Sequence, residues 1–251
     1  MADYVKTSNL LVLLKQAHLG GVINECVLDI SRGKGTVEAI DITNTIVFIS
    51  TLNVASRSVR GELGLGSLDM VIKFLSTMSD NKLNTEITAN RMIIKRKDKR
   101  RRLDYLLSQP QLIATRLRMD GDKSENIEQK FLSSVEVQAE LDESFIKDFN
   151  SYITTLKTKV VTVVIEDDDV WFHLGPKSEH QFKLSLPLVE NDESFEINVK
   201  VNGEYLSKIF AAIEFDDEEG TTIGFGEDSP IVIESPLGMW AISPSEDLEE
   251  E

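Results

Sequence analysis

Cysteine is nearly absent from the sequence, which has one in 251 residues, so an internal disulfide is excluded. Long apolar runs are absent too, since none comes near the roughly 18 residues of a membrane-spanning helix. No apolar segment follows a basic start in the manner of a signal peptide. These absences predict a soluble, intracellular protein with no membrane partner. A chain of this length can bury one or two ordinary hydrophobic cores.

Lys and Arg are absent from the last part of the chain. Residues 216–251 contain twelve Asp or Glu and no base, so most of the net charge of −16 belongs to this segment. Ordinary DNA-binding domains carry a basic patch, because neutralised phosphates release counterions and so supply affinity. The overall composition is therefore not that of a protein that binds nucleic acid by simple adhesion.

Residues that would build a catalytic or metal site are scarce. His18, His173 and His180 lack the spacing of metal ligands, and Cys26 lies in a strand-like run as a small apolar residue would. The acids of Glu166–Asp169 fall at an expected hairpin turn with no second carboxylate group to complete a cation site. Gly61–Gly66 lacks the lysine of a phosphate-binding loop. We expect no cofactor and no enzymatic activity, and a metal-dependent enzyme that uses Asp167–Asp169 is a remote alternative.

Four segments with helical periodicity stand among many short strand-like runs. They begin at Ser8, Ser67, Asp142 and Gly203 and extend to Leu19, Met78, Leu156 and Ile213. Alternating apolar residues predict strands, for example over residues 45–49, 160–165 and 194–201.

The spacing of these helices predicts a duplication. Their starts are 59, 75 and 61 residues apart, and the long interval contains a polar connector from about residue 109 to 130. We therefore predict an α+β fold of two duplicated domains, each with two helices on one face of antiparallel sheets. The predicted bounds are 1–108, a connector at 109–132, 133–245, and an acidic tail at 246–251.

Two parts of the sequence resemble a known family. Ile23–Ile30, followed by a turn and Ala39–Asp41, forms the first match, and Asp228–Glu234 followed by Gly238–Ser245 forms the second. Both resemble the DNA sliding clamps, the ring-shaped polymerase processivity factors, in the PCNA-like branch and in T4-like phages. Those clamps have two domains per subunit and roughly this length, whereas the bacterial clamp carries three.

The resemblance implies a homotrimeric ring at replication sites, in a host cytoplasm or a nucleus. Such a ring encircles duplex DNA without reading its sequence and binds a DNA polymerase and a clamp loader through short peptide motifs. Encirclement replaces adhesion, so an acidic protein can serve, and negative outer faces keep DNA away from the wrong surfaces. The alternative is an acidic interaction protein with the same fold that does not encircle DNA, such as a subunit of a heteromeric checkpoint-type ring or a transcription accessory factor.

The resemblance also assigns candidate DNA contacts, because the helices of clamps line the hole and present basic side chains to the phosphates of DNA. On the helices these are Lys15, His18, Lys73, Lys147, Lys157 and Lys208. The basic run 95–102, at an expected hairpin tip, adds Lys97, Lys99 and Arg100. A lone surface lysine is usually only solvated, and the run also fits a nuclear-targeting peptide or a solvated tip.

Two further surfaces follow from the resemblance. The partner-peptide pocket would contain Ile40, Ile46, Leu112, Ile113, Leu117, Pro230, Ile231, Ile242, Ser243 and Pro244. Ring closure would pair the strand Leu103–Leu107 with residues 181–186 of a neighbouring subunit, because exposed sheet edges invite strand addition. The candidate interface residues are Tyr105, Leu107, Phe182 and Leu184. The alternative is that Tyr105 is an ordinary strand residue within a monomer.

Overall fold

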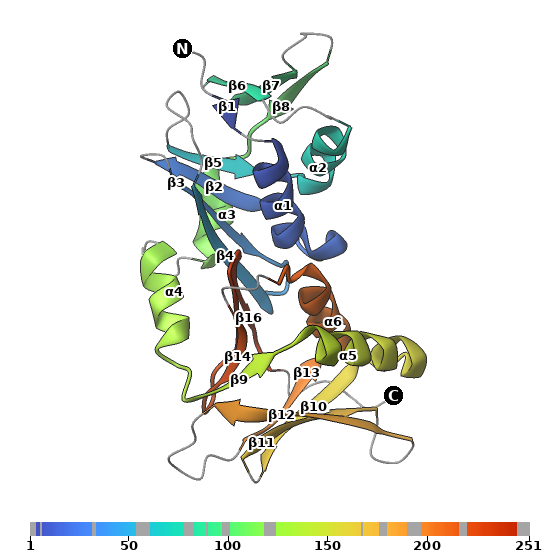
Figure 1. Cartoon of the computed structure of the whole chain (residues 1–251). Helices are drawn as coiled ribbons and strands as arrows, with labels where there is room; N and C mark the ends of the chain where they lie inside the picture. The colour runs from blue at the N-terminus through green and yellow to red at the C-terminus, as the bar shows by residue number, and fades with distance from the viewer. Residues whose placement is uncertain are drawn as a thin grey trace. The chain divides into compact units, whose positions relative to one another are not determined.

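The computed structural model describes residues 4–5, 7–31, 34–53, 61–77, 83–88, 90–96, 101–117, 124–166, 168–175, 180–189, 197–215 and 220–244. The chain divides into two compact units, unit 1 (residues 1–124) and unit 2 (residues 125–251), coloured from blue to red in Figure 1. The boundary between the units falls inside the connector predicted at residues 109–132.

The elements of unit 1 follow one another in this order: β1 (Tyr4–Val5), α1 (Thr7–His18), the short 3-10 helix η1 (Leu19–Gly21), β2 (Cys26–Ser31), β3 (Lys34–Ile40), β4 (Ile46–Asn53), β5 (Gly61–Leu65), α2 (Leu68–Ser76), β6 (Leu83–Thr88), β7 (Arg91–Arg96), β8 (Arg102–Leu106) and α3 (Pro110–Leu117).

Unit 2 continues the chain. Its elements are α4 (Ser124–Leu132), β9 (Val137–Leu141), α5 (Glu143–Leu156), β10 (Val160–Glu166), β11 (Asp169–Leu174), β12 (Phe182–Val189), β13 (Ile197–Asn202), α6 (Gly203–Ala212), β14 (Thr221–Phe225), β15 (Ile231–Ser235) and β16 (Gly238–Ile242).

The order of elements repeats between the units. Apart from η1, α3 and α4, the described part of each unit runs strand, helix, four strands, helix, three strands. The strand pairings repeat as well, since β2–β3, β3–β4 and β2–β5 in unit 1 correspond to β10–β11, β11–β12 and β10–β13 in unit 2. The predicted α+β fold of two duplicated domains is confirmed.

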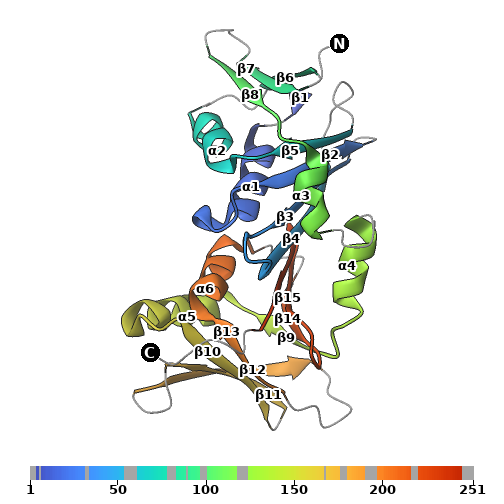
Figure 2. The ribbon, with the colours of Figure 1, turned by 180° about the vertical axis from the view of Figure 1, so that it is seen from behind.

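Unit 1 builds two antiparallel sheets. The first has the order β4-β3-β2-β5 and the second has the order β1-β6-β7-β8. Helix α1 packs against α2 and against β3 and β4. Helix α3 covers the opposite face of the first sheet, where Ile113 and Val27 bury each other, and Figure 2 shows it from that side.

The helices of unit 1 form where the apolar spacing predicts them. Leu10, Leu13, Leu14 and Ala17 of α1 are buried, and so are the residues at positions 68, 71 and 75 of α2. Residues three or four apart lie on one face of a helix, so each helix presents a single apolar stripe to its sheet.

Unit 2 joins its strands into one antiparallel run, β13-β10-β11-β12-β9-β14-β15-β16. Helices α5 and α6 pack against each other, α5 also against β11 and β12 and α6 against β13. The core is rich in aromatic rings. The Phe149 ring lies 4.9 Å from the Phe210 ring and 6.1 Å from the Phe172 ring, both edge-on.

Caps set the starts of α5 and α6. The Asp142 carboxylate accepts a 2.7 Å hydrogen bond from the backbone N–H of Phe145. The Asn202 side chain accepts hydrogen bonds from the N–H groups of Glu204 and Tyr205. A side chain at this position binds backbone donors that the first helical turn leaves unpaired. The helix start predicted at Asp142 is therefore confirmed.

The predicted connector contains two helices that sequence reasoning missed, α3 and α4. Both are short, at 8 and 9 residues, so each shows little more than two turns of periodicity. The pair Ile127 and Phe131 in α4, four residues apart, was the available signal.

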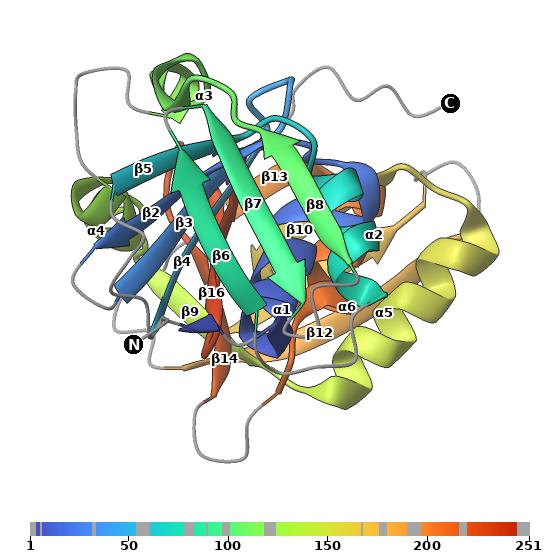
Figure 3. The same ribbon diagram turned by 90° about the horizontal axis from the view of Figure 1, so that it is seen from above.

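The basic run 95–102 does lie at a hairpin. Strands β7 and β8 pair antiparallel with Lys95 opposite Arg102. Figure 3 shows β8 at the edge of the sheet β1-β6-β7-β8. Lys97, Lys99 and Arg100 lie outside the described residues.

Candidate functional site

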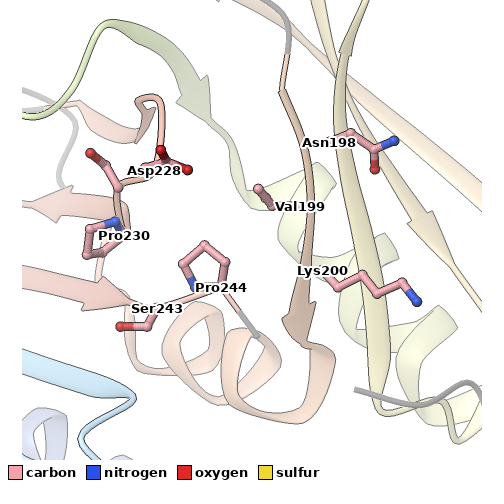
Figure 4. Close-up of a pocket in the computed structure, with 8 residues that line it drawn as sticks. Asn198, Val199, Lys200, Asp228, Pro230, Ser243 and Pro244 are labelled. Atoms are coloured by element: carbon pink, nitrogen blue, oxygen red, sulfur yellow. The ribbon is translucent and has the colours of Figure 1, made fainter. Parts of the chain in front are cut away.

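A groove with a volume of about 850 Å³ opens on unit 2. Three segments line it: Asn198, Val199 and Lys200 of β13, Asp228, Ser229 and Pro230 between β14 and β15, and Ser243 and Pro244 after β16. Figure 4 shows Val199 on the side of β13 that faces the two prolines, while Lys200 points the other way. The groove thus has an apolar wall of Val199, Pro230 and Pro244.

Strand β13 gives this groove an open backbone edge. Among the described residues β13 pairs with β10 along one side only. On the other wall, Pro230 and Pro244 have no N–H, so at these two positions the backbone offers only a carbonyl group. An extended peptide in the groove would find backbone partners as well as apolar contacts.

The loop that carries Pro230 is held against the chain segment that follows α4. Glu227 N–H donates to a Glu136 carboxylate oxygen at 3.0 Å, and Glu136 N–H donates to the Phe225 carbonyl at 2.8 Å. Gly226 allows this approach, because a Cβ at that position would lie 1.9 Å from the Ser134 carbonyl oxygen. The groove wall is therefore set by close backbone packing inside unit 2.

The predicted pocket residues of unit 2 separate into two groups. Pro230, Ser243 and Pro244 line the groove. Ile231 and Ile242 face each other across β15 and β16 and are 1% and 0% exposed, so their side chains belong to the core. Sequence reasoning missed the β13 wall, whose signal was a strand pattern placed just before the Asn202–Gly203 helix start.

The predicted pocket residues of unit 1 lie around a turn and on α3. Ile40 and Ile46 are buried at the ends of β3 and β4. In α3, Leu112 is 70% exposed and Ile113 is buried against β2. Leu117 is the last residue of α3.

The turn between β3 and β4 is organised by the buried carboxylate of Asp41. It accepts hydrogen bonds from the N–H groups of Thr45 at 2.6 Å and Ile46 at 2.7 Å, and from the Thr43 N–H at 3.0 Å. The turn places Ile42 outside, where it is 85% exposed.

Among the basic side chains on the helices of unit 1, some are exposed and without an ion pair in the described residues, and others are paired or half-buried. Lys15 is exposed on α1, and Lys73 on α2 forms a 2.5 Å ion pair with Asp69 one turn earlier. Burial lowers the pKa of His18, the Lys73 charge acts in the same direction, and Asp69 opposes both. His18 is half-buried, and its neutral form is favoured.

Unit 2 repeats this balance of charge. Lys147 is exposed on α5 beside Asp148, and Lys208 on α6 forms a 2.9 Å ion pair with Glu204. Lys157 is exposed just after α5, in a left-handed conformation with φ of 53°.

The four helices α1, α2, α5 and α6, together with the cap residue Lys157, contain five lysines. The same helices contain four acids, Asp69, Glu143, Asp148 and Glu204. The lysines thus outnumber the acids by one, and the net charge of these helices is close to zero.

The candidate interface residues take different places. Tyr105 is 4% exposed, and its hydroxyl accepts a 2.7 Å hydrogen bond from Ser67 N–H, which fixes the side chain inside unit 1. Burial raises the pKa of this hydroxyl. Leu107 and Leu184 are half-buried, and Phe182 is 37% exposed and stacks on Tyr152 with ring centres 4.2 Å apart.

No protein-family model matches the sequence, and no curated protein matches it. Solved structures do match. A DNA polymerase sliding clamp from Pseudomonas aeruginosa, solved with a ligand, is similar with a TM-score of 0.71 and 10% identity, over 97% of this chain and 66% of that one. A beta clamp from H. pylori, in complex with 5-chloroisatin, is similar with a TM-score of 0.72 and 12% identity, over 100% of this chain and 65% of that one.

This chain has the sliding-clamp fold. The likeness covers nearly all of it, so the fold that Ile23–Ile30, Ala39–Asp41 and the C-terminal strands suggested is confirmed. The chain spans about two thirds of the length of these two clamps.

The residues that were considered for a metal site or for catalysis have structural roles. Glu166 pairs with Asp169 at the β10–β11 turn, and burial raises the pKa of the Cys26 thiol, which disfavours the reactive thiolate. In the described ranges, no three His, Cys, Asp or Glu side chains gather where they could hold a metal ion. The described helices include none with the length and apolarity needed to cross a membrane.

Proposed function

We propose that this protein is a DNA sliding clamp, which encircles duplex DNA and tethers a DNA polymerase to it. One observation carries the proposal: the sliding-clamp fold extends over 97% and 100% of the chain in two comparisons. The protein acts as a scaffold at replication sites and catalyses no reaction.

The ring consists of three copies of this chain. Two duplicated units in a chain that spans about two thirds of a bacterial clamp are what a two-domain subunit would have. If each ring holds six such domains, three head-to-tail subunits close it.

Retention on DNA depends on topology more than on adhesion. The described helices present almost as many acids as lysines, so few phosphates are held, and contacts to phosphate carry no sequence information. Lys15, Lys147 and Lys157 are the strongest phosphate-contact candidates, because no described acid forms an ion pair with any of them. Lys73 and Lys208 share their charge with Asp69 and Glu204, and His18 completes the set.

The groove on unit 2 takes a short extended peptide from the polymerase or the clamp loader. Its support is the apolar wall of Val199, Pro230 and Pro244 beside the open edge of β13.

Retention on nicked circular plasmid tests the proposal. The assembled protein is incubated with the plasmid, passed through a large-pore column, and the plasmid is then cut once. A threaded ring stays with the circle and leaves after linearisation, because only a free end lets it slide off. Binding that survives linearisation indicates adhesion, and an assembled protein that never stays on the circle indicates the non-encircling alternative.

Charge reversal on the helices refines this test. Lys15→Glu with Lys147→Glu should shorten the residence on the circle and lower its salt dependence, since each lost phosphate contact reduces the salt slope by roughly one unit. Lys130→Glu, an exposed change on α4, is the matched control and should leave both quantities unchanged.

A further inference from the structure

A row of polar and basic side chains crosses one face of the strands β13, β10, β11 and β12 in unit 2. The strand register places Lys200 opposite Thr162, Thr162 opposite His173, and His173 opposite Lys183. Residues opposite each other in neighbouring strands project from the same face of a sheet. These four residues, called the basic row below, therefore extend over about 14 Å at the usual strand spacing.

The basic row lies on the outer face of these strands, away from α5 and α6. Neighbouring residues on the inner face, such as Val163 and Phe172, are fully buried, and the Phe172 ring lies 5.1 Å from the Phe145 ring of α5. On the outer face Lys183 is exposed and Lys200 is half-buried. Unit 2 contains eight Lys and no Arg against 30 Asp or Glu, so this row is a local reversal of its charge.

One end of the basic row borders the groove. Gly203 N–H donates to the Lys159 carbonyl at 2.7 Å, and hydrogen-bonded pairs alternate along an antiparallel ladder. The backbone N–H and C=O groups of Asn198 and Lys200 therefore point away from β10 and toward the groove, which both residues line. The Lys200 side chain points away from the two prolines in Figure 4, because it belongs to the outer face.

An acidic segment of this chain, residues 245–251, begins at the same groove. It directly follows Pro244, which lines the groove on the side opposite β13. The segment contains five Asp or Glu, no base and one apolar residue, Leu248. Seven extended residues reach about 23 Å, so the segment is long enough to cross the groove and then follow the basic row over about 14 Å.

Acids elsewhere on unit 2 disfavour other paths for this segment. Asp228 lines the groove itself. Glu166 and Asp169 pair at the far end of the outer face, four residues along their strands from Thr162 and His173 of the basic row. That separation is about 13 Å, which exceeds the screening length of about 8 Å at physiological salt. These acids therefore repel the segment from their own end and weaken its attraction to the basic row only slightly.

We propose that residues 245–251 lie across the basic row of their own copy, with their acids against Lys200 and Lys183. They thereby cover the open edge of β13 until a partner peptide displaces them. The inference rests on the proposed peptide groove and adds its regulation. Exposed ion pairs are individually weak, but a tethered segment binds at a high effective concentration. The segment therefore docks on its own copy and still gives way to a peptide that fills the groove.

Carbodiimide cross-linking tests the position of the segment. The reagent joins an amine to a carboxylate only where the two groups are in contact. In the full chain without DNA, Lys183 and Lys200 should link to residues 246–251, whereas Lys130, exposed on α4 of the same unit, should not. Mass spectrometry identifies the linked peptides. The yield should fall about fivefold in salt of about 1 M, because surface charges are then screened.

Isotope labelling shows whether the segment stays on its own copy. Heavy and light chains are mixed before assembly, and links within one isotopic form support the proposal. Three results would overturn it: mixed-isotope links at the frequency of random pairing, linking of Lys130 to the segment as strong as that of Lys183 and Lys200, or links of these two lysines only to acids outside residues 246–251.

Hydrogen exchange tests whether the segment covers β13. A neutral variant replaces all five acids, by Glu246→Gln, Asp247→Asn, Glu249→Gln, Glu250→Gln and Glu251→Gln. In this variant the fragment that contains Asn198 and Lys200 should exchange about fivefold faster than in the parent, because its edge loses its cover. Strand β11, which is paired on both sides, is the control and should not change.

A second variant separates cover from charge. Lys183→Gln with Lys200→Gln removes the other side of the contact and should also speed exchange in β13. Hydroxide catalyses the exchange, so charge alone would have opposite effects: lost acids would speed it and lost lysines would slow it. Slower or unchanged exchange in the lysine variant contradicts the proposal, provided that thermal unfolding shows both variants folded.

These assays use no DNA and so separate this inference from the proposed function. If the links and the exchange rates are as expected but circular plasmid is not retained, the clamp function fails and the docked segment stands. If plasmid is retained as a ring requires but Lys183 and Lys200 form no links to the segment, the docking fails and the clamp function stands.

Discussion

Units 1 and 2 repeat one order of strands and helices but hold it together differently. In unit 2, β9 is 5 residues long and joins β12 to β14, so its strands form a single run. In unit 1 the corresponding strand, β1, has 2 residues and pairs only with β6 among the described strands. A fold can therefore be duplicated while the continuity of its sheet is lost, because each half still buries an apolar face under two helices.

The cores and charges differ as well. Unit 2 packs the rings of Phe145, Phe149, Phe172, Phe210 and Phe225 together, whereas α1 and α2 of unit 1 bury mainly aliphatic side chains. Unit 1 is net basic and unit 2 strongly acidic. Surface charge has little influence on which fold forms, so the two units can differ in charge while sharing one fold.

The largest effect is expected from the aromatic core of unit 2. Phe149→Ala removes a fully buried ring and should lower the free energy of unfolding of unit 2 by about 3–5 kcal/mol. The matched change in unit 1 is Leu14→Ala, at about 2–5 kcal/mol. Both tryptophans, Trp171 and Trp240, lie in unit 2, so fluorescence in a urea titration follows that unit alone. Equal shifts of the fluorescence midpoint by both variants would show that the units unfold together.

A smaller loss of stability is expected from a change in the loop between β14 and β15, which carries Pro230 of the groove. Gly226→Ala places a methyl group against the Ser134 carbonyl and should cost about 1–3 kcal/mol, because the backbone must move. Gly220→Ala is the control, since nothing lies within 4 Å of its added carbon. Thermal unfolding checks the difference, and equal melting temperatures would argue against close packing behind the groove.

A change in the β3–β4 turn of unit 1 should lower the free energy of unfolding by about as much as the change at Gly226, or slightly less. Asp41→Ala leaves the N–H groups of Thr45 and Ile46 without their acceptor, at about 1–3 kcal/mol for a buried donor. Asp41→Asn keeps one acceptor oxygen and should lose less. Circular dichroism in a urea titration measures both, and an Asp41→Ala variant as stable as the parent would refute the role of the carboxylate.

The smallest effect compares two helix starts. Asp142→Ala removes the cap of α5 and should cost about 1 kcal/mol. Ser67 precedes α2 without a side-chain cap bond, so Ser67→Ala should be nearly neutral. Matched urea titrations provide the check, and an equal loss at both positions would contradict the assigned caps.

Much of the fold could be predicted from periodicity. The stripes of α1, α2, α5 and α6 and the β7–β8 hairpin depend on residues close together in sequence, and local pattern reports these well. Helices α3 and α4 were missed because two turns give a weak pattern and their stability comes from tertiary burial, as Ile113 against Val27 shows.

The candidate site was predictable only in part. Pro230, Ser243 and Pro244 were named from the resemblance, and they line the groove. The β13 wall was not foreseen, and the inward side chain of Tyr105 was expected only as the alternative to an interface residue. Both depend on which strand lies beside which.

The amino-acid sequence by itself determined the helices, the duplication and the clamp-like ends, since each is written in the spacing of apolar residues. Only the tertiary structure decided which lysines keep a free charge and which strand edges stay open. Three-dimensional neighbours decide both ion pairs such as Lys208–Glu204 and the lack of a second partner strand for residues 182–187 of β12 within the described part of the chain. Spacing along the chain describes one face of one element, whereas electrostatics and edge pairing depend on the distance between elements.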